Sequence, residues 1–121
     1  QLGKPVIFAT REIPVINDIT INEAKQIGIN KIAKVISSGS KAPGTILEKC
    51  SRDFVGIFER SDMVISKGQG NYESLSDSKR DIVFLLKAKC PVIAKHLNVN
   101  VGDIIFKHNI GTNKCTDQFI L

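Results

Sequence analysis

The fold is decided by the stretch DMVISKGQGNYESL, residues 62–75, in which a short apolar run leads directly into a glycine-rich loop. The β-branched and apolar residues of 62–66 predict a strand. Gly68 and Gly70 predict a loop over residues 67–71, and a helix is expected from Tyr72. A strand, a loop and a helix in this order are typical of an α/β protein with a parallel sheet.

The same alternation continues on both sides of this stretch. Capping-box spacings, Thr20 to Glu23 and Thr45 to Glu48, predict the starts of two further helices. Apolar runs predict the remaining strands and helices: strands at 6–9, 33–37, 82–86 and 101–106, and helices over 21–28, from 45 toward 60, and over 91–97. The pattern predicts an α/β fold with three α/β/α layers and a mostly parallel sheet covered on both faces.

Length and composition indicate one ordinary globular domain. The chain has 121 residues, 42% of them hydrophobic and 24% charged, which excludes a disordered tail, a collagen-like fibre and a disulfide-stapled mini-protein. The net charge of +5 is spread over single residues and favours anionic partners, a small phosphorylated molecule as well as a polymer. With aromatic residues at 6% and no Trp, a nucleic-acid stacking surface is poorly supplied, so no nucleic-acid partner is expected.

The cysteines and the apolar runs bear on location. Cys50, Cys90 and Cys115 include no C-x-x-C pair, so reduced thiols in the cytoplasm are the simplest interpretation. The longest apolar run, 82–86, is far too short for a membrane span, and no signal peptide is visible. The chain begins with Gln1 close to its first predicted strand, so we expect an upstream portion. The oligomeric state is left open.

Candidate site residues follow the predicted strands, where the loops of a parallel sheet gather at one edge and form a composite site. Asp18 can offer a carboxylate to Mg²⁺ or Mn²⁺, or it is an ordinary turn residue. The loop at 67–71 can cradle a phosphate with Lys67 beside it, or it is a tight turn with Asn71 as a helix cap. Lys89 points into this crevice or is an exposed lysine at a strand end.

Several segments together resemble a known family. The run Arg11-x-x-Pro14-x-Ile16-Asn17-Asp18 is followed by Gly39-Ser40-x-x-Pro43-Gly44-Thr45 and then by Lys67-Gly68-Gln69-Gly70-Asn71-Tyr72-Glu73. The run Phe84-Leu85-Leu86-Lys87-Ala88-Lys89-Cys90-Pro91 and the pair Gly102-Asp103 complete the series. In this order they resemble the carboxyl-terminal half of the damage-control phosphatases, in their stand-alone prokaryotic branch. The resemblance makes residues 1–107 the phosphatase core and residues 108–121 a tail.

The resemblance implies a metal-dependent phosphatase that hydrolyses small phosphate esters, such as sugar phosphates or damaged phosphometabolites. It implies Asp18 as a ligand of a divalent ion (Mn, Ni, Co or Mg), and Lys67 and Lys89 as catalytic residues. The residues implied to bind substrate are Lys67, Gly68, Gln69, Gly70, Asn71 and Lys89. The Asp-Asn metal motif that precedes these segments in the family does not occur in this chain. We therefore expect a truncated form lacking an upstream helical portion, and the alternative is a non-catalytic phosphate-binding module.

Overall fold

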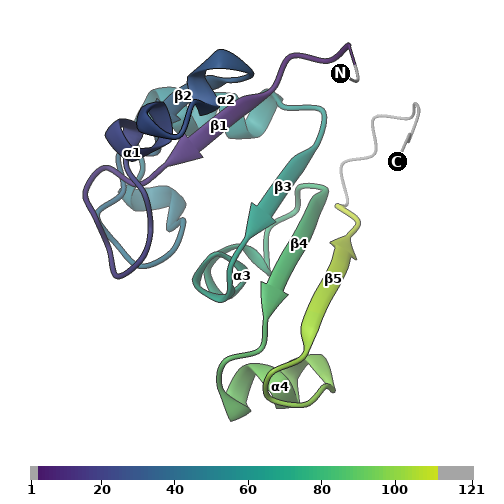
Figure 1. Ribbon diagram of the computed structural model, residues 1–121. Coiled ribbons are helices and arrows are strands. Elements are labelled where there is room, and N and C mark those ends of the chain that lie inside the picture. Colours follow the sequence, from purple (N-terminus) through teal and green to yellow (C-terminus); the bar gives the residue numbers. More distant parts are fainter. Residues whose placement is uncertain (1–2, 112–121) are drawn as a thin grey trace. The chain divides into compact units, whose positions relative to one another are not determined.

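The computed structural model describes residues 3–111 and divides the chain into two compact units. Unit 1 comprises residues 1–60 and unit 2 residues 61–121. The α-helices and strands of both units are labelled in Figure 1. Each unit is described by itself below.

Unit 1 contains a two-stranded parallel sheet with short helices around it. Its strands pair with Ile7 opposite Lys34 and Thr10 opposite Ser37. Its elements, in chain order, are β1 (Ile7–Thr10), α1 (Ile21–Gln26), η1 (Ile29–Lys31), β2 (Lys34–Ser37), η2 (Leu47–Lys49) and α2 (Arg52–Arg60). Two parallel strands need a crossover connection, and here α1 and η1 supply it.

Helix α1 begins where the capping-box spacing predicts it. The backbone N–H of Thr20 donates to Oε2 of Glu23 at 2.9 Å, and the Thr20 hydroxyl donates to the same oxygen. These two hydrogen bonds hold the pKa of Glu23 below its ordinary value of 4.5, because they favour the charged carboxylate. The helix buries Ala24 and ends by Ile27.

The second capping-box spacing does not start a helix, and that prediction is wrong. Thr45 is buried, and its Oγ1 accepts a hydrogen bond from Arg11. Residues after it form only the 3₁₀ turn η2, and the α-helix begins at Arg52. Ser51 caps that helix, since its Oγ accepts from the Phe54 N–H at 3.2 Å.

Unit 2 contains a three-stranded mixed sheet in the order β3-β4-β5. Its strands are β3 (Val64–Lys67), β4 (Ile82–Lys87) and β5 (Ile104–Asn109), and its helices are α3 (Gln69–Leu75) and α4 (Pro91–Leu97). The first two strands run parallel, and β5 pairs antiparallel to β4. The strand expected at 101–106 begins three residues later, at Ile104. Residues 100–103 instead form a turn, in which the Asn100 N–H donates to Asp103 Oδ2 at 2.9 Å.

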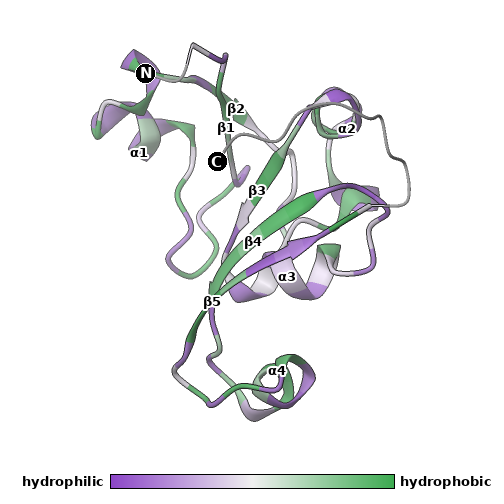
Figure 2. Cartoon of the chain, turned by 90° about the vertical axis from the view of Figure 1, so that its right-hand side faces the viewer, coloured by the Kyte–Doolittle hydropathy of each residue, from purple (hydrophilic) through white to green (hydrophobic). Residues whose placement is uncertain are grey.

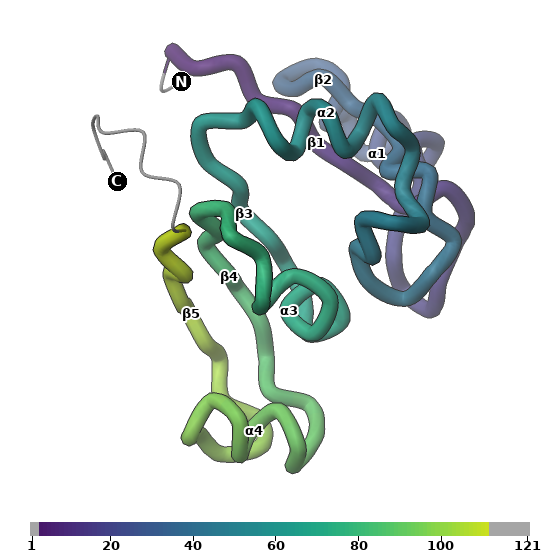
Figure 3. Tube along the Cα trace, turned by 180° about the vertical axis from the view of Figure 1, so that it is seen from behind, coloured from purple at the N-terminus to yellow at the C-terminus, as the bar shows by residue number. Residues whose placement is uncertain are grey.

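The core of unit 2 lies between its sheet and helix α3. Tyr72 and Phe84 are almost fully buried and meet edge to face, with their ring centroids 5.0 Å apart. Strand β4, the most hydrophobic strand in Figure 2, also buries Ile82 and Leu86 on this side. Seen from behind in Figure 3, α3 packs across β3 and β4. Most of the large buried side chains of this unit therefore lie in the β3–α3–β4 segment.

The predicted α/β class is confirmed, as a mixed α/β structure with two small sheets. Across residues 3–111, no helix is long and apolar enough to cross a membrane. Residues 108 and 109, expected in the tail, belong to β5. The rest of the expected tail beyond Gly111, with Cys115, lies outside the described residues.

Candidate functional site

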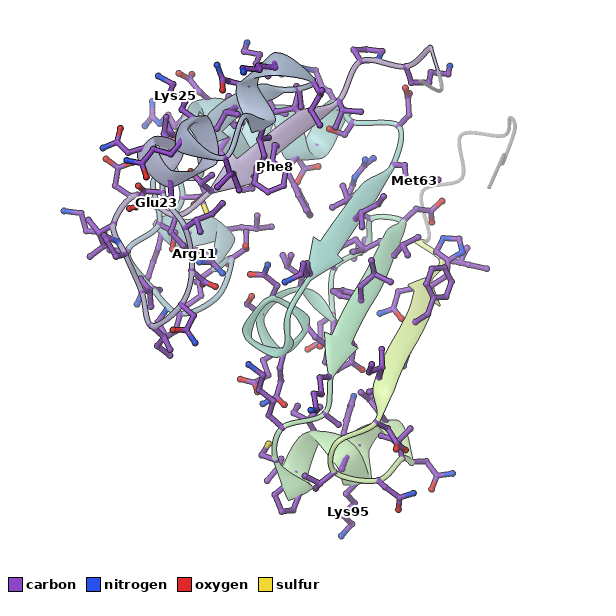
Figure 4. The ribbon with its side chains drawn as sticks, in the orientation of Figure 1. Phe8, Arg11, Glu23, Lys25, Met63 and Lys95 are labelled. Carbon is purple, nitrogen blue, oxygen red and sulfur yellow. The ribbon has the colours of Figure 1, made fainter. Side chains whose placement is uncertain are left out.

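In unit 1, Asp18 lies in a tight turn after β1. The turn closes because the Asp18 N–H donates to the carbonyl oxygen of Val15 at 2.8 Å. The Asp18 side chain is 50% exposed, whereas that of Arg11 is only 10% exposed. Arg11 Nε donates to Asp18 Oδ2 at 3.0 Å, which forms an ion pair. Arg11, labelled in Figure 4, thus fixes the carboxylate that the sequence predicts as a metal ligand.

Arg11 also binds the loop that follows β2. Its Nη1 donates to Thr45 Oγ1 at 3.1 Å. Its backbone N–H donates to the carbonyl oxygen of Ile19, the residue that follows Asp18. Sequence reasoning missed Arg11 and Thr45 as members of one cluster, because a single Arg and a single Thr 34 positions apart carry no spacing signal. Both residues do lie in the segments that carry the family resemblance.

The serines of the loop after β2 build the loop itself. Ser38 and Ser40 are buried. Ser40 Oγ accepts from the Ala42 N–H at 3.2 Å and donates to the carbonyl oxygen of Gly44 at 3.4 Å. These hydroxyls satisfy backbone groups that the loop buries, as buried polar groups require.

In unit 2, Lys67 ends β3 and is exposed. The next residue, Gly68, has φ 103° and ψ 153°, a conformation that is essentially restricted to glycine. A Cβ there would meet nothing within 4 Å, so dihedral strain and not packing requires glycine. The Gly68 N–H donates to the carbonyl oxygen of Leu85 at 2.8 Å, which ties the loop to β4.

Helix α3 begins at Gln69 and not at Tyr72, and Gly68 is its N-cap. The interpretation of Asn71 as the helix cap is therefore wrong. Asn71 lies in the first turn, and its Nδ2 donates to the carbonyl oxygen of Lys67 at 2.9 Å. This hydrogen bond closes the loop on itself and holds the end of β3 in place.

The side chain of Gln69 joins this loop to the segment that follows β4. Its Oε1 accepts from the Lys89 N–H at 2.7 Å. Its Nε2 donates to Glu73 Oε1 at 2.8 Å and to Cys90 Sγ at 3.5 Å. The structure therefore brings the 67–71 loop and Lys89, which are distant in sequence, to one edge of one sheet.

This edge carries three exposed lysines, Lys67, Lys87 and Lys89, and we refer to it as the lysine edge. Strands β3 and β4 run parallel, with Lys67 opposite Leu85, so their carboxyl ends lie at the same edge. Lys67 ends β3, Lys87 ends β4, and Lys89 follows β4. Ammonium groups and backbone N–H groups at the ends of parallel strands are suited to an anion such as phosphate.

The described residues do not provide a complete metal site. Among residues 3–111, no group of three or more His, Cys, Asp or Glu side chains could hold an ion. Asp18 offers one carboxylate, and its Oδ2 is paired with Arg11. Hard divalent ions take several oxygen ligands, so Asp18 alone does not fit the full site that the resemblance implies.

Cys50 does not show the environment of an activated nucleophile. Cys50 and Cys90 are free and partly buried. Burial raises the pKa of the Cys50 thiol, outweighing the nearby positive charge of Arg11, which acts in the opposite direction. Cys50 Sγ donates to the carbonyl oxygen of Ile46 at 3.3 Å, as a structural thiol does.

Comparison with known proteins identifies the family. A model of the damage-control phosphatase ARMT1-like domain matches residues 1–105, so the chain belongs to this family. The resemblance expected from the sequence segments is thereby confirmed.

Two curated archaeal proteins and one solved structure are similar to the chain. The damage-control phosphatase PH1575 of Pyrococcus horikoshii is 44% identical over 86% of the chain and 37% of its own length. A damage-control phosphatase of Archaeoglobus fulgidus is 40% identical over 78% of the chain and 33% of its own length. The crystal structure of a DUF89 family protein from P. horikoshii superposes with a TM-score of 0.83 at 43% identity, covering 87% of the chain and 37% of that protein. The chain therefore spans about a third of the length of these relatives.

Proposed function

We propose that this chain provides the phosphate-binding part of a metal-dependent phosphatase that hydrolyses small phosphate esters. The substrate class is a small phosphorylated metabolite, such as a sugar phosphate or a damaged phosphometabolite. Family membership supports the phosphatase activity. The main support for phosphate binding at the lysine edge is the hydrogen bond from the Lys89 N–H to the Gln69 side chain. This bond joins the segment of Lys89 to the loop of Lys67 at one sheet edge.

At the lysine edge, the residues of the 67–71 loop and Lys89 have separate proposed roles. Lys67 and Lys89 stabilise negative charge on the transferring phosphoryl group, so they are the proposed catalytic residues. Gly68 and Gly70 let the backbone approach the phosphate closely, because they carry no side chain. Gln69, Gly70 and Asn71 form the first turn of α3 directly after Gly68, and their backbone is proposed to contact the phosphate.

Asp18 is proposed as one ligand of a divalent ion (Mn, Ni, Co or Mg). Such an ion, when bound, supplies Lewis-acid polarisation of a phosphoryl oxygen. Its remaining ligands are proposed to come from outside the described residues, because no other group of acidic or imidazole side chains among residues 3–111 is suited to it. Arg11 orients the Asp18 carboxylate by holding Oδ2.

The bounds of the phosphatase core and its location in the cell are part of the same proposal. Residues 1–107 are proposed to constitute the phosphatase core, as part of a three-layer α/β/α structure. The cytoplasm is the proposed location, since free thiols such as Cys50 and Cys90 persist under reducing conditions.

The second candidate function is a non-catalytic module that binds phosphate without hydrolysing it. The incomplete ligand set around Asp18 favours this alternative for the chain taken alone. Both functions use the same lysine edge, and they differ only in turnover.

A phosphatase screen separates the two functions. The chain is incubated with a panel of small phosphate esters and Mn²⁺, Ni²⁺, Co²⁺ or Mg²⁺, and phosphate release is measured. Turnover that a chelator and Asp18→Ala both abolish supports the phosphatase. Phosphate binding by calorimetry without turnover supports the module. The absence of both would refute the lysine edge as a phosphate site.

A further inference from the structure

We infer that the side chain of Gln69 is a positioning residue that holds Lys89 beside the 67–71 loop, and that it acts on phosphate only through Lys89. This inference rests on the proposed function and assigns a separate task to one side chain within it. The Gln69 backbone N–H keeps its proposed place among the phosphate-binding groups.

The amide of Gln69 is already engaged at both ends. Its oxygen accepts from the Lys89 N–H at 2.7 Å, and its nitrogen donates to Glu73 Oε1 at 2.8 Å and to Cys90 Sγ at 3.5 Å. A glutamine amide has two donors and one acceptor oxygen, so these three contacts fix the direction in which it points. The side chain is therefore committed to protein partners and is not presented to a ligand.

The segment that donates this hydrogen bond is also held by the turn before β5. Ala88, next to Lys89, donates to the carbonyl oxygen of Asp103 at 2.9 Å and accepts from the Gly102 N–H at 2.7 Å. Gln69 is the residue of α3 that reaches across to Lys89. Together these contacts hold the backbone of the segment between the loop before α3 and the turn before β5.

Holding the backbone of Lys89 matters because its side chain is long and exposed. A lysine that must be ordered when its ligand binds loses conformational freedom, and that loss reduces affinity. A backbone already fixed at Lys89 leaves only the side chain to be ordered. Removing the Gln69 amide is therefore expected to weaken phosphate binding only while Lys89 is present.

The hydrogen bond is tested first, without any ligand, by amide hydrogen exchange of the 121-residue chain. Gln69→Met removes the acceptor while keeping the length of the side chain, and we expect faster exchange at Lys89 N–H. Gln69→Glu combined with Glu73→Gln keeps an acceptor oxygen at residue 69 and a donor–acceptor pair between residues 69 and 73, and it should restore the slow exchange. Unchanged exchange at Phe84 and Leu86 shows that β4 is intact in both variants. Equal exchange at Lys89 in wild type and Gln69→Met would overturn the inference.

The functional consequence is tested by titrating the same chain with inorganic phosphate. We expect Gln69→Met to raise the Kd by about threefold to tenfold. In a Lys89→Ala background the same substitution should change the Kd no further, because coupled residues are not additive. The matched control is Gln26→Met, which exchanges an exposed glutamine of unit 1 and should leave the Kd unchanged.

The outcomes of this titration separate the two proposals. If wild type binds no phosphate, the proposed function fails, and the role of Gln69 fails with it. If wild type binds phosphate and Gln69→Met binds it equally well, the positioning role alone is refuted. The same holds if the effects of Gln69→Met and Lys89→Ala simply add, since an independent structural effect would do so.

Discussion

Arg11 Nε lies 3.0 Å from Asp18 Oδ2, and the same guanidinium donates through Nη1 to Thr45 Oγ1 at 3.1 Å. One largely buried side chain thus connects the turn after β1 to the loop after β2. The planar fork of an arginine can serve two acceptors in fixed directions, which a lysine ammonium cannot do equally well. The stabilities of Arg11→Met and Arg11→Lys therefore test this connection.

Arg11→Met is expected to lower the free energy of unfolding by about 1–3 kcal/mol, because hydrogen bonds to a buried charged group are lost. Arg11→Lys should recover only part of this loss. Urea unfolding followed by circular dichroism measures both values. The control is Arg52→Ala at an exposed position of α2, which should change stability by less than about 0.5 kcal/mol. Equal stabilities for Arg11→Met and wild type would contradict the connecting role.

Gly68→Ala is expected to destabilise unit 2 by about 1–3 kcal/mol, because an L residue is strained at φ 103° and ψ 153°. The space around the missing Cβ is open, so a clash makes no contribution. Gly56→Ala, inside helix α2, is the matched control. There the new Cβ meets only the movable end of the Arg60 side chain at 3.1 Å, and a gain of about 0.5–1 kcal/mol is expected. Thermal unfolding of both variants should therefore give shifts of opposite sign.

Lys67→Ala is expected to lower metal-dependent turnover of a phosphate ester by roughly a hundredfold, since one lost contact to developing negative charge costs about 3 kcal/mol. Steady-state phosphate release measures the change in kcat. Lys95→Ala removes the same charge from an exposed position of α4, labelled in Figure 4, and should leave kcat unchanged. Similar losses in both variants would show that net charge, and not Lys67, is responsible.

The capping box of α1 predicts a dependence of stability on pH. The pKa of Glu23 is lower in the folded protein than its ordinary value of 4.5, because Thr20 donates two hydrogen bonds to the carboxylate. A lowered folded pKa means that the stabilisation is fully present above pH 4.5 and is lost as the pH falls through the folded pKa. Wild type should exceed Glu23→Gln in stability near neutral pH, and the difference should shrink below pH 4.5. A difference that stays constant between pH 7 and pH 3 would argue against this linkage.

Local patterns predicted most elements of the fold. Four of the five strands and helices α1 and α4 occur close to their expected positions, because apolar runs and cap residues act over a few neighbouring residues. Thr45 shows where this reasoning fails. Its spacing to Glu48 matches a capping box, but Arg11 engages its hydroxyl, and the α-helix starts only after Ser51. A tertiary contact here overrides a local preference, and no local pattern contains that contact.

The candidate site was predictable in part for the same reason. The glycine loop and Lys67 stand out in the sequence, and the parallel pairing of β3 and β4 explains why Lys89 joins them. The bridging role of the Gln69 side chain was not predictable, because the two partners that it bridges to, Lys89 and Cys90, lie 20 and 21 residues away. Asp18 was found from its turn, but its pairing with Arg11 depends on how that turn closes.

The direction of β5 has a practical consequence for binding assays. Because this strand runs antiparallel to β4, with Asn109 opposite Ile82 and Ile104 opposite Lys87, it finishes beside the start of β4. The described backbone therefore leaves the sheet at the end remote from Lys67, as the yellow strand in Figure 1 shows. A biotin attached at Asn109 would therefore tether unit 2 to a sensor chip by the end of its sheet that is remote from the lysine edge.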